Sequence, residues 1–358
     1  MRIGVIGAGQ LGQMLGFAGQ ALGIECRFID PSDHPPAAAC GEVIRSAYDD
    51  AAALEKLAAD CDVITYEFEN VPVAAVETLR QSCDVFPPPA ALASAQDRLD
   101  EKRLFEELGI PLPGYHPVDS RADLADAATA LGTPLVLKTR RLGYDGKGQF
   151  VVRDSGQLDE AWQALGGRPL IAEQWVPFDF EVSAIGVRGR GGETRIYPLT
   201  HNIHEGGILR VSRAPVETET LHALAEQYMQ KLLGHLDYVG VLALELFVVG
   251  DRLLANEFAP RVHNSGHWTI EGATTSQFEN HLRAVAGLPL GETACKGHAG
   301  MVNLIGEIPD AVRNPDLGHL HDYGKSPRPG RKLGHITVTA ATAGERDRQV
   351  DIIRRAIA

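Results

Sequence analysis

The chain has 358 residues, of which 44% are hydrophobic and 23% charged, and 47 acidic residues against 34 basic ones give a net charge of −13. This length allows two or three domains with sizeable cores, and the acidic balance argues against a general nucleic-acid binder. No apolar run approaches the about 18 residues that cross a membrane.

The cysteines are scattered, and no two of them form a Cys-x-x-Cys pair, so the sequence signals neither a zinc site nor a redox motif. The first residues are typical of a strand rather than of a signal peptide. An odd number of cysteines without a secretory signal favours a reducing compartment and predicts a cytoplasmic protein.

The first hundred residues predict a doubly wound sheet. Residues 2–6 form an expected strand that enters Gly7-Ala8-Gly9-Gln10-Leu11-Gly12, a helix follows, and a second strand over 25–29 ends at Asp30. This order matches the dinucleotide-binding fingerprint. The alternation continues with expected helices over 51–59 and 73–81 and strands over 62–66 and 84–86. It predicts a parallel sheet with helices on both faces, within a first domain over 1–111.

A smaller α+β unit is expected over 112–173. The triple proline at 87–89 is interpreted as the exit linker from the sheet, and one long helix is expected over 94–108. A second helix is expected over 122–131.

The centre of the small unit is a glycine-rich hairpin. Leu135–Leu137 read as a buried strand that ends at Lys138. The loop that follows carries three glycines and three cations before the next strand at Phe150. Glycines let the backbone approach an anion closely, so the loop suits a polyphosphate. An ordinary charged hairpin is the alternative, and the Walker P-loop spacing is absent.

Two acids mark the third domain, expected over 174–358. Glu245 lies in an apolar strand over 240–249, and Glu257 lies in the next strand over 252–258, across a Gly-Asp turn. Two carboxylates on paired strands repel each other unless a cation lies between them. Mg²⁺ with a nucleotide would supply that cation, and a salt bridge to Arg261 or another base is the alternative.

With these pieces in place, the sequence resembles the ATP-grasp superfamily and, within it, the 5-(carboxyamino)imidazole ribonucleotide synthases of de novo purine synthesis. The resemblance covers nearly the whole chain and rests on motifs at 7–15, 66–70, 143–149, 173–176, 198–210, 256–268 and 328–335. It implies a Rossmann-like preATP-grasp domain, a small lid and a C-terminal ATP-grasp domain.

The resemblance implies an ATP site between the lid and the C-terminal domain. Arg98 and Lys138 would contact its phosphates, and a loop of Gly143, Tyr144, Asp145, Gly146, Lys147, Gly148 and Gln149 would cover it. The adenine hinge would be Glu173, Gln174, Trp175 and Val176. Glu181 would bind the ribose, and His204 and Asn256 would line the site. Glu245 and Glu257 would bind Mg²⁺, or Mn²⁺ in its place. One departure is Ala259, where many superfamily members have Asn.

The resemblance also implies a ribonucleotide site. Its phosphate is expected at Lys325, Arg331 and Lys332 with Arg261, and the rest of the substrate at Gln10, Leu11, Glu69 and Asn70. Candidates near the reacting amine are Tyr144, Asp145, His263 and Asn264, and Asp145 could orient the amine or accept its proton.

The implied reaction joins bicarbonate to aminoimidazole ribonucleotide through carboxyphosphate, with ATP converted to ADP and phosphate. The implied assembly is a homodimer whose product passes to the mutase that follows it, with no nucleic acid or membrane as partner.

Three alternatives remain. The first is another ATP-grasp ligase, such as a formate-dependent phosphoribosylglycinamide formyltransferase. The second is an NAD-dependent oxidoreductase, based on residues 7–12 and Asp30, and the third is a nucleotide sensor without turnover.

Overall fold

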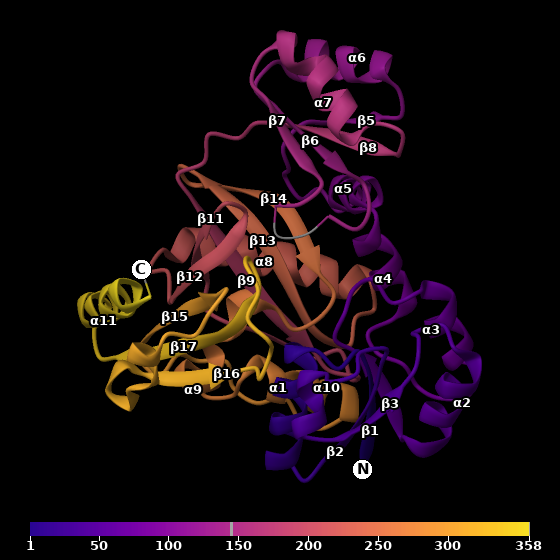
Figure 1. The fold of residues 1–358 in the computed structure, drawn as a ribbon, viewed down its shortest axis with the longest axis vertical. Helices are drawn as coiled ribbons and strands as arrows, with labels where there is room; N and C mark the ends of the chain where they lie inside the picture. Colours follow the sequence, from indigo (N-terminus) through magenta and orange to yellow (C-terminus); the bar gives the residue numbers. More distant parts are fainter. Residues whose placement is uncertain (144–145, 358) are drawn as a thin grey trace.

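The structure, a computed structural model, describes residues 1–143 and 146–357. The predicted Tyr144 and Asp145 therefore lie outside the described residues. Three sheets organise the fold, and the small one stands apart at the top of the molecule (Figure 1). Within the described part of the chain, no helix is long and apolar enough to cross a bilayer.

The N-terminal sheet is parallel, as the alternation predicted. Its strand order is β3-β2-β1-β4, with β1 at Arg2–Ile6, β2 at Glu25–Asp30, β3 at Glu42–Arg45 and β4 at Val63–Tyr66. Side chains of β1 alternate between two cores, so Ile3 and Val5 face one core and Ile6 the other. Helices cover both faces: α1 (Gln10–Ala21) packs on the first core, and α2 (Ala51–Asp60) and α3 (Val73–Leu79) pack on the second.

Two local predictions in this region are wrong. The segment expected as a strand over 84–86 makes only a single bridge, from Val85 to Ile64. The single helix expected over 94–108 is two helices, α4 (Pro89–Gln96) and α5 (Arg98–Glu107). The break falls at Asp97, whose carboxylate accepts a hydrogen bond from the Leu99 N–H at 3.0 Å and thereby caps α5.

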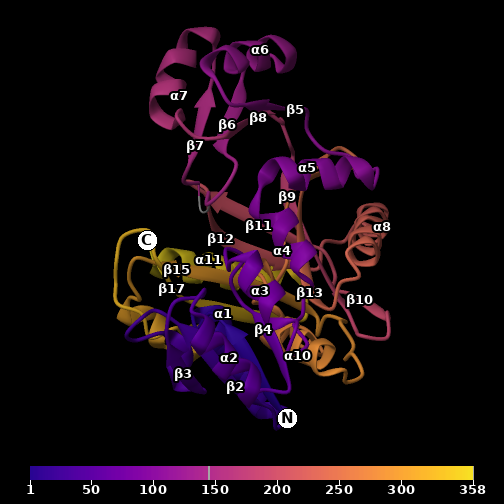
Figure 2. The same ribbon diagram turned by 90° about the vertical axis from the view of Figure 1, so that its right-hand side faces the viewer.

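The small sheet is antiparallel and has its own core. Its order is β5-β8-β6-β7, with β5 at Tyr115–Val118, β6 at Leu135–Thr139, β7 at Gln149–Val152 and β8 at Leu170–Gln174. It packs against α6 (Arg121–Leu131) and α7 (Leu158–Leu165). Figure 2 shows this lid above the rest of the molecule, with α5 at its base.

The described part of the C-terminal region forms a nine-stranded antiparallel sheet of order β14-β13-β9-β11-β12-β15-β17-β16, with β10 paired to β9. The strands are β9 (Phe180–Arg188), β10 (Thr194–Ile196), β11 (Thr200–Glu205), β12 (Ile208–Ala214), β13 (Gly240–Val249), β14 (Arg252–Ala259), β15 (His298–Ile305), β16 (His319–Asp322) and β17 (Lys332–Ala340). The accompanying helices are α8 (Glu219–His235), α9 (Thr269–Gly272), α10 (Gln277–Ala286) and α11 (Ala343–Ala356).

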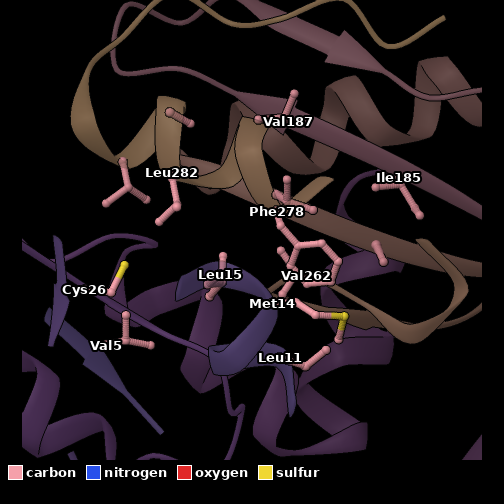
Figure 3. Packing of buried hydrophobic residues seen from close by; sticks show 14 of the residues in the cluster. Val5, Leu11, Met14, Leu15, Cys26, Ile185, Val187, Val262, Phe278 and Leu282 are labelled. Atoms are coloured by element: carbon pink, nitrogen blue, oxygen red, sulfur yellow. The ribbon is translucent and has the colours of Figure 1, made fainter. Parts of the chain in front are cut away.

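The N-terminal and C-terminal regions share one hydrophobic core. Leu11, Met14 and Leu15 of α1 pack in the same cluster as Phe278 and Leu282 of α10 (Figure 3). Because this core crosses the boundary, the start of α1 is fixed against the large sheet.

Candidate active site

One large cleft, of about 860 Å³, is lined by residues from all three regions. It brings together many of the predicted site residues, namely Gln10, Leu11, Glu69, Asn70, Arg98, Gly143, Lys147, His204, Glu245, Glu257, Arg261, His263, Asn264, Lys325, Arg331 and Lys332. The lid loop at Gly143 and Lys147 thus faces the same space as the two acids of the β13–β14 hairpin. Among the described residues, the predicted contacts that do not line this cleft are Lys138, Gly146, Gly148, Gln149, Glu173, Gln174, Trp175, Val176, Glu181 and Asn256.

Glu245 and Glu257 are direct partners across the β13–β14 hairpin, where the pairing register shifts after Glu245. The Arg98 guanidinium donates to Glu257 Oε2 at 2.7 Å, and His263 Nε2 lies 3.2 Å from Glu245 Oε1. The predicted alternative, a salt bridge from one of these acids to a base, is therefore present for Glu257, and the base is Arg98. Arg261 pairs instead with Glu69.

The two acids have opposite electrostatic surroundings. Burial raises the pKa of Glu245, and the negative charge of Glu257 raises it further. Burial would also raise the pKa of Glu257, but the charges of Arg98 and Lys138 outweigh it and lower that pKa. Within the described residues there is no cluster of three or more metal-ligating side chains. A pair of carboxylates is nevertheless a donor set that Mg²⁺ uses together with substrate phosphates, so the residues fit that ion.

A buried cation layer lies behind the acids. Lys138 Nζ donates to Glu173 Oε2 at 2.8 Å, and Lys102 Nζ lies 3.6 Å from the same oxygen and 2.5 Å from the Asn256 carbonyl oxygen. Burial would raise the pKa of Glu173, but Lys102 and Lys138 lower it to about 2. Sequence analysis assigned no role to Lys102. Its spacing of four residues from Arg98 on one face of α5 was the available signal.

Glu181 and His204 form a close pair between β9 and β11. Burial lowers the pKa of His204, but the hydrogen bond to Glu181 and the charge of Glu245 raise it above the usual value. Among the predicted hinge residues, Glu173 is buried and Trp175 is 43% exposed.

Cations of the segment between β16 and β17 also line the cleft. Lys325 Nζ donates to Gln10 Oε1 at 2.8 Å and to the Lys332 carbonyl oxygen at 3.2 Å. Arg331 donates to the Ser326 carbonyl oxygen at 3.1 Å. Burial, followed by the nearby charge of Arg331, lowers the pKa of Lys325 to about 8.

His263 and Asn264 also line the cleft. Burial, with the charge of Arg261, lowers the pKa of His263 well below its usual range. The ring is fixed at Nδ1 by the Ser265 hydroxyl at 2.9 Å. Asn264 exchanges two side-chain hydrogen bonds with Asn303, at 3.1 and 2.7 Å.

The glycine turn after β1 does not present open N–H groups to a dinucleotide. The Glu67 carboxylate accepts from the Gly9 N–H at 2.8 Å and the Gly12 N–H at 3.1 Å. Asp30, the acid that would bind a ribose in a dinucleotide site, is buried and accepts from the Ala8 N–H at 3.0 Å. The oxidoreductase alternative therefore loses both of the features on which it was based.

Comparison with known proteins places this geometry in a family. The chain matches the ribonucleotide synthetase preATP-grasp domain over residues 1–96, the ATP-grasp domain over 103–278 and the phosphoribosylaminoimidazole carboxylase C-terminal domain over 299–349. It is 53% identical over 343 residues to N5-carboxyaminoimidazole ribonucleotide synthase of Pseudomonas aeruginosa, with 95% of each chain covered.

Solved structures agree. The crystal structure of N5-carboxyaminoimidazole ribonucleotide synthetase from Thermus thermophilus is 51% identical and has a TM-score of 0.95, with 99% of this chain and 98% of that one covered. An Aspergillus clavatus enzyme in complex with ADP and 5-aminoimidazole ribonucleotide is 32% identical with a TM-score of 0.92, at 99% and 98% coverage. These matches confirm the predicted ATP-grasp fold class. The chain belongs to the N5-carboxyaminoimidazole ribonucleotide synthase family and is an ATP-grasp ligase.

Proposed function

We propose that this protein carboxylates 5-aminoimidazole ribonucleotide with bicarbonate at the cost of ATP, giving 5-carboxyaminoimidazole ribonucleotide, ADP and phosphate in de novo purine biosynthesis. The observation that carries the proposal is a single cleft whose lining combines the two acids, the lid loop and a cluster of cations. Such a cleft can hold a nucleotide and a second phosphate-bearing substrate at the same time. A relative with ADP and 5-aminoimidazole ribonucleotide bound supports it.

The nucleotide would lie at the lid end. Arg98, Lys138 and the loop at 143–149 would contact its phosphates, residues 173–176 would hold the adenine, and Glu181 would bind the ribose, flanked by His204 and Asn256. Glu245 and Glu257 would hold Mg²⁺, or Mn²⁺ in its place, which when bound neutralises charge on the triphosphate. Arg98 already pairs with Glu257 at 2.7 Å, so it is poised to share that carboxylate with the ion.

The reaction would proceed in two transfers. A bicarbonate oxygen attacks the γ-phosphorus of ATP, the bond to the β-phosphate oxygen breaks, and ADP and carboxyphosphate result. The exocyclic amine then attacks the carboxyl carbon, or the carbon of CO₂ released in the closed cleft, phosphate leaves, and the amine loses one proton. Exclusion of water by the lid protects the labile intermediate.

The ribonucleotide would lie at the opposite end. Lys325, Arg331 and Lys332, with Arg261, would bind its phosphate, and Gln10, Leu11, Glu69 and Asn70 would line the rest. The low pKa of His263 makes it a weak proton acceptor, so we propose that His263 and Asn264 orient the amine. Tyr144 and Asp145 stay predictions for the reacting centre, with Asp145 as the proton acceptor.

Phosphate release from ATP tests the proposal. Release should require both bicarbonate and 5-aminoimidazole ribonucleotide. Turnover with formate and phosphoribosylglycinamide instead would identify the alternative ligase, and nucleotide binding with no turnover under any condition would identify a sensor.

We also propose that the protein is a cytoplasmic homodimer whose product passes to a mutase. The free thiols of all five cysteines support a reducing compartment. Light scattering after size-exclusion chromatography measures the assembly, and a mass of one chain would contradict the homodimer.

A further inference from the structure

The glycine turn at the start of α1 contains an anion supplied by the chain itself. Glu67 follows β4, and its backbone N–H donates to the Ile6 carbonyl oxygen at 3.0 Å, which fixes it beside β1. Its carboxylate accepts the N–H groups of Gly9 and Gly12, and the residue is only 8% exposed. These N–H groups belong to the turn that binds a pyrophosphate in dinucleotide-binding proteins.

Contact with this carboxylate explains two glycines of the motif. A Cβ atom on Gly7 would lie 2.7 Å from Glu67 Cγ, and one on Gly9 would lie 2.8 Å from Glu67 Oε1. Neither position could take a Cβ atom unless the Glu67 side chain moved, and Gly7 also has a φ of +101°, which other residues rarely adopt. Glycine is needed here for the approach of Glu67, in the way that other turns need it for the approach of a phosphate.

The same turn sets the position of two cleft residues. Gln10 and Leu11 form the first turn of α1 directly after Gly9, and both line the cleft. The Gln10 side chain accepts from Lys325 Nζ at 2.8 Å. The negative charge of Glu67 also acts on Lys325, where it opposes the lowering of that pKa by burial and by Arg331.

We propose that Glu67 is a positioning residue: its carboxylate takes the place of a bound phosphate in the glycine turn and holds α1 so that Gln10 presents Lys325 to the phosphate of the ribonucleotide. The second half of this proposal rests on the proposed function. The first half, occupancy of the turn by an internal anion, does not.

Asp30 provides a control that shares the turn but not the cleft, because Glu67 itself lines the cleft and Asp30 does not. Its carboxylate supports the same turn from the sheet side, accepting from the Ala8 N–H at 3.0 Å and the Tyr48 hydroxyl at 2.8 Å. It is 5% exposed and, among the described residues, is not part of the cleft lining. Asp30→Asn should therefore destabilise the turn without changing the cleft.

The kinetic test compares Glu67→Gln with Asp30→Asn. We expect Glu67→Gln to raise the KM for the ribonucleotide about tenfold or more, because the amide cannot accept from both N–H groups, while the KM for ATP changes less than about twofold. Asp30→Asn should lower the Tm and leave both KM values within about twofold. Equal ribonucleotide KM values in the two variants, with similar losses of Tm, would show that Glu67 is merely structural.

Chemical rescue tests occupancy without an activity assay. In Glu67→Ala, acetate should raise the Tm with a saturable dose dependence, and it should not do so in Asp30→Asn. A Glu67→Ala variant whose Tm responds to acetate no more than that of Asp30→Asn would overturn the occupancy. If the wild-type protein fails to turn over the ribonucleotide, the proposed function fails while this experiment still decides the role of Glu67 in the turn.

Discussion

Glu245 and Glu257 are cross-strand partners, yet their surroundings differ. Arg98 compensates the charge of Glu257. The side chain that lies 3.2 Å from the Glu245 carboxyl group is that of His263, whose strongly lowered pKa favours the neutral ring, so it compensates no charge. Burial and the charge of Glu257 raise the pKa of Glu245 more than His204 and Lys332 lower it, so an outside cation would stabilise the ionised form of this buried carboxyl group. This asymmetry is the physical reason to expect a metal ion with the nucleotide.

Glu257→Gln should reduce turnover by about 100-fold or more, because it removes a proposed metal ligand and leaves the Arg98 charge without its partner. Steady-state phosphate release at increasing Mg²⁺ concentration measures the effect, with the exposed Glu77→Gln as control. Unchanged turnover would refute the assignment of the metal site.

Lys325 should give the reaction a pH dependence. Its pKa is lowered to about 8, so its ammonium group loses its proton as the pH rises through 8. The kcat/KM for the ribonucleotide should fall above about pH 8, while the kcat/KM for ATP should not follow the same curve. Lys325→Arg keeps its charge at these pH values and should remove the fall. A wild-type profile that is flat from pH 7 to 9.5, or one shared by the arginine variant, would contradict this account.

The helix α5 shows what local sequence could and could not predict. Its existence follows from its composition, and its face with Arg98 and Lys102 follows from the four-residue spacing. The break before it does not, because Asp97 is held by Arg140 and Arg141 of the lid loop that follows β6, more than forty residues later. Likewise the glycine turn matched the dinucleotide-binding fingerprint, but the Gly9 N–H donates to Glu67, 58 residues away. Local patterns predicted the elements and the chemistry of the site, whereas partners distant in sequence decide how each motif is used.

Lys102→Met on this helix should lower the free energy of unfolding by about 1–3 kcal/mol, because it removes one of the cations near buried Glu173, where Lys138 and Arg98 remain, and removes the bond to the Asn256 carbonyl. Lys102 is completely buried. Its neighbour Arg103 is an exposed control whose pair with Asp100, at 3.5 Å, should contribute about 0–1 kcal/mol. Chemical denaturation of Lys102→Met and Arg103→Met compares them, and coincident unfolding curves would show that the buried cation contributes little.

At the scale of the molecule, the cores divide the chain differently from the three sheets. One hydrophobic cluster joins α1 to α10 and the large sheet, while the lid has a cluster of its own (Figures 1 and 3). The N-terminal and C-terminal regions should therefore unfold together, and the lid should be able to open by itself. This arrangement would keep the ribonucleotide end of the cleft fixed while the ATP end exchanges its ligand.

Two matched truncations of fully buried leucines test this division, Leu15→Ala in the shared core and Leu124→Ala in the lid. Each should lower the free energy of unfolding of the region that contains it by about 2–5 kcal/mol. By hydrogen exchange with mass spectrometry, Leu15→Ala should speed exchange in β1, α1, α10 and β13 together, because these elements bury one core. Leu124→Ala should speed exchange in β5, β6 and β8 and leave β1 and β13 protected. If Leu124→Ala loosens the large sheet to the same extent as the lid, the two bodies are one cooperative unit, and the entry of ATP would then require motion of the whole molecule.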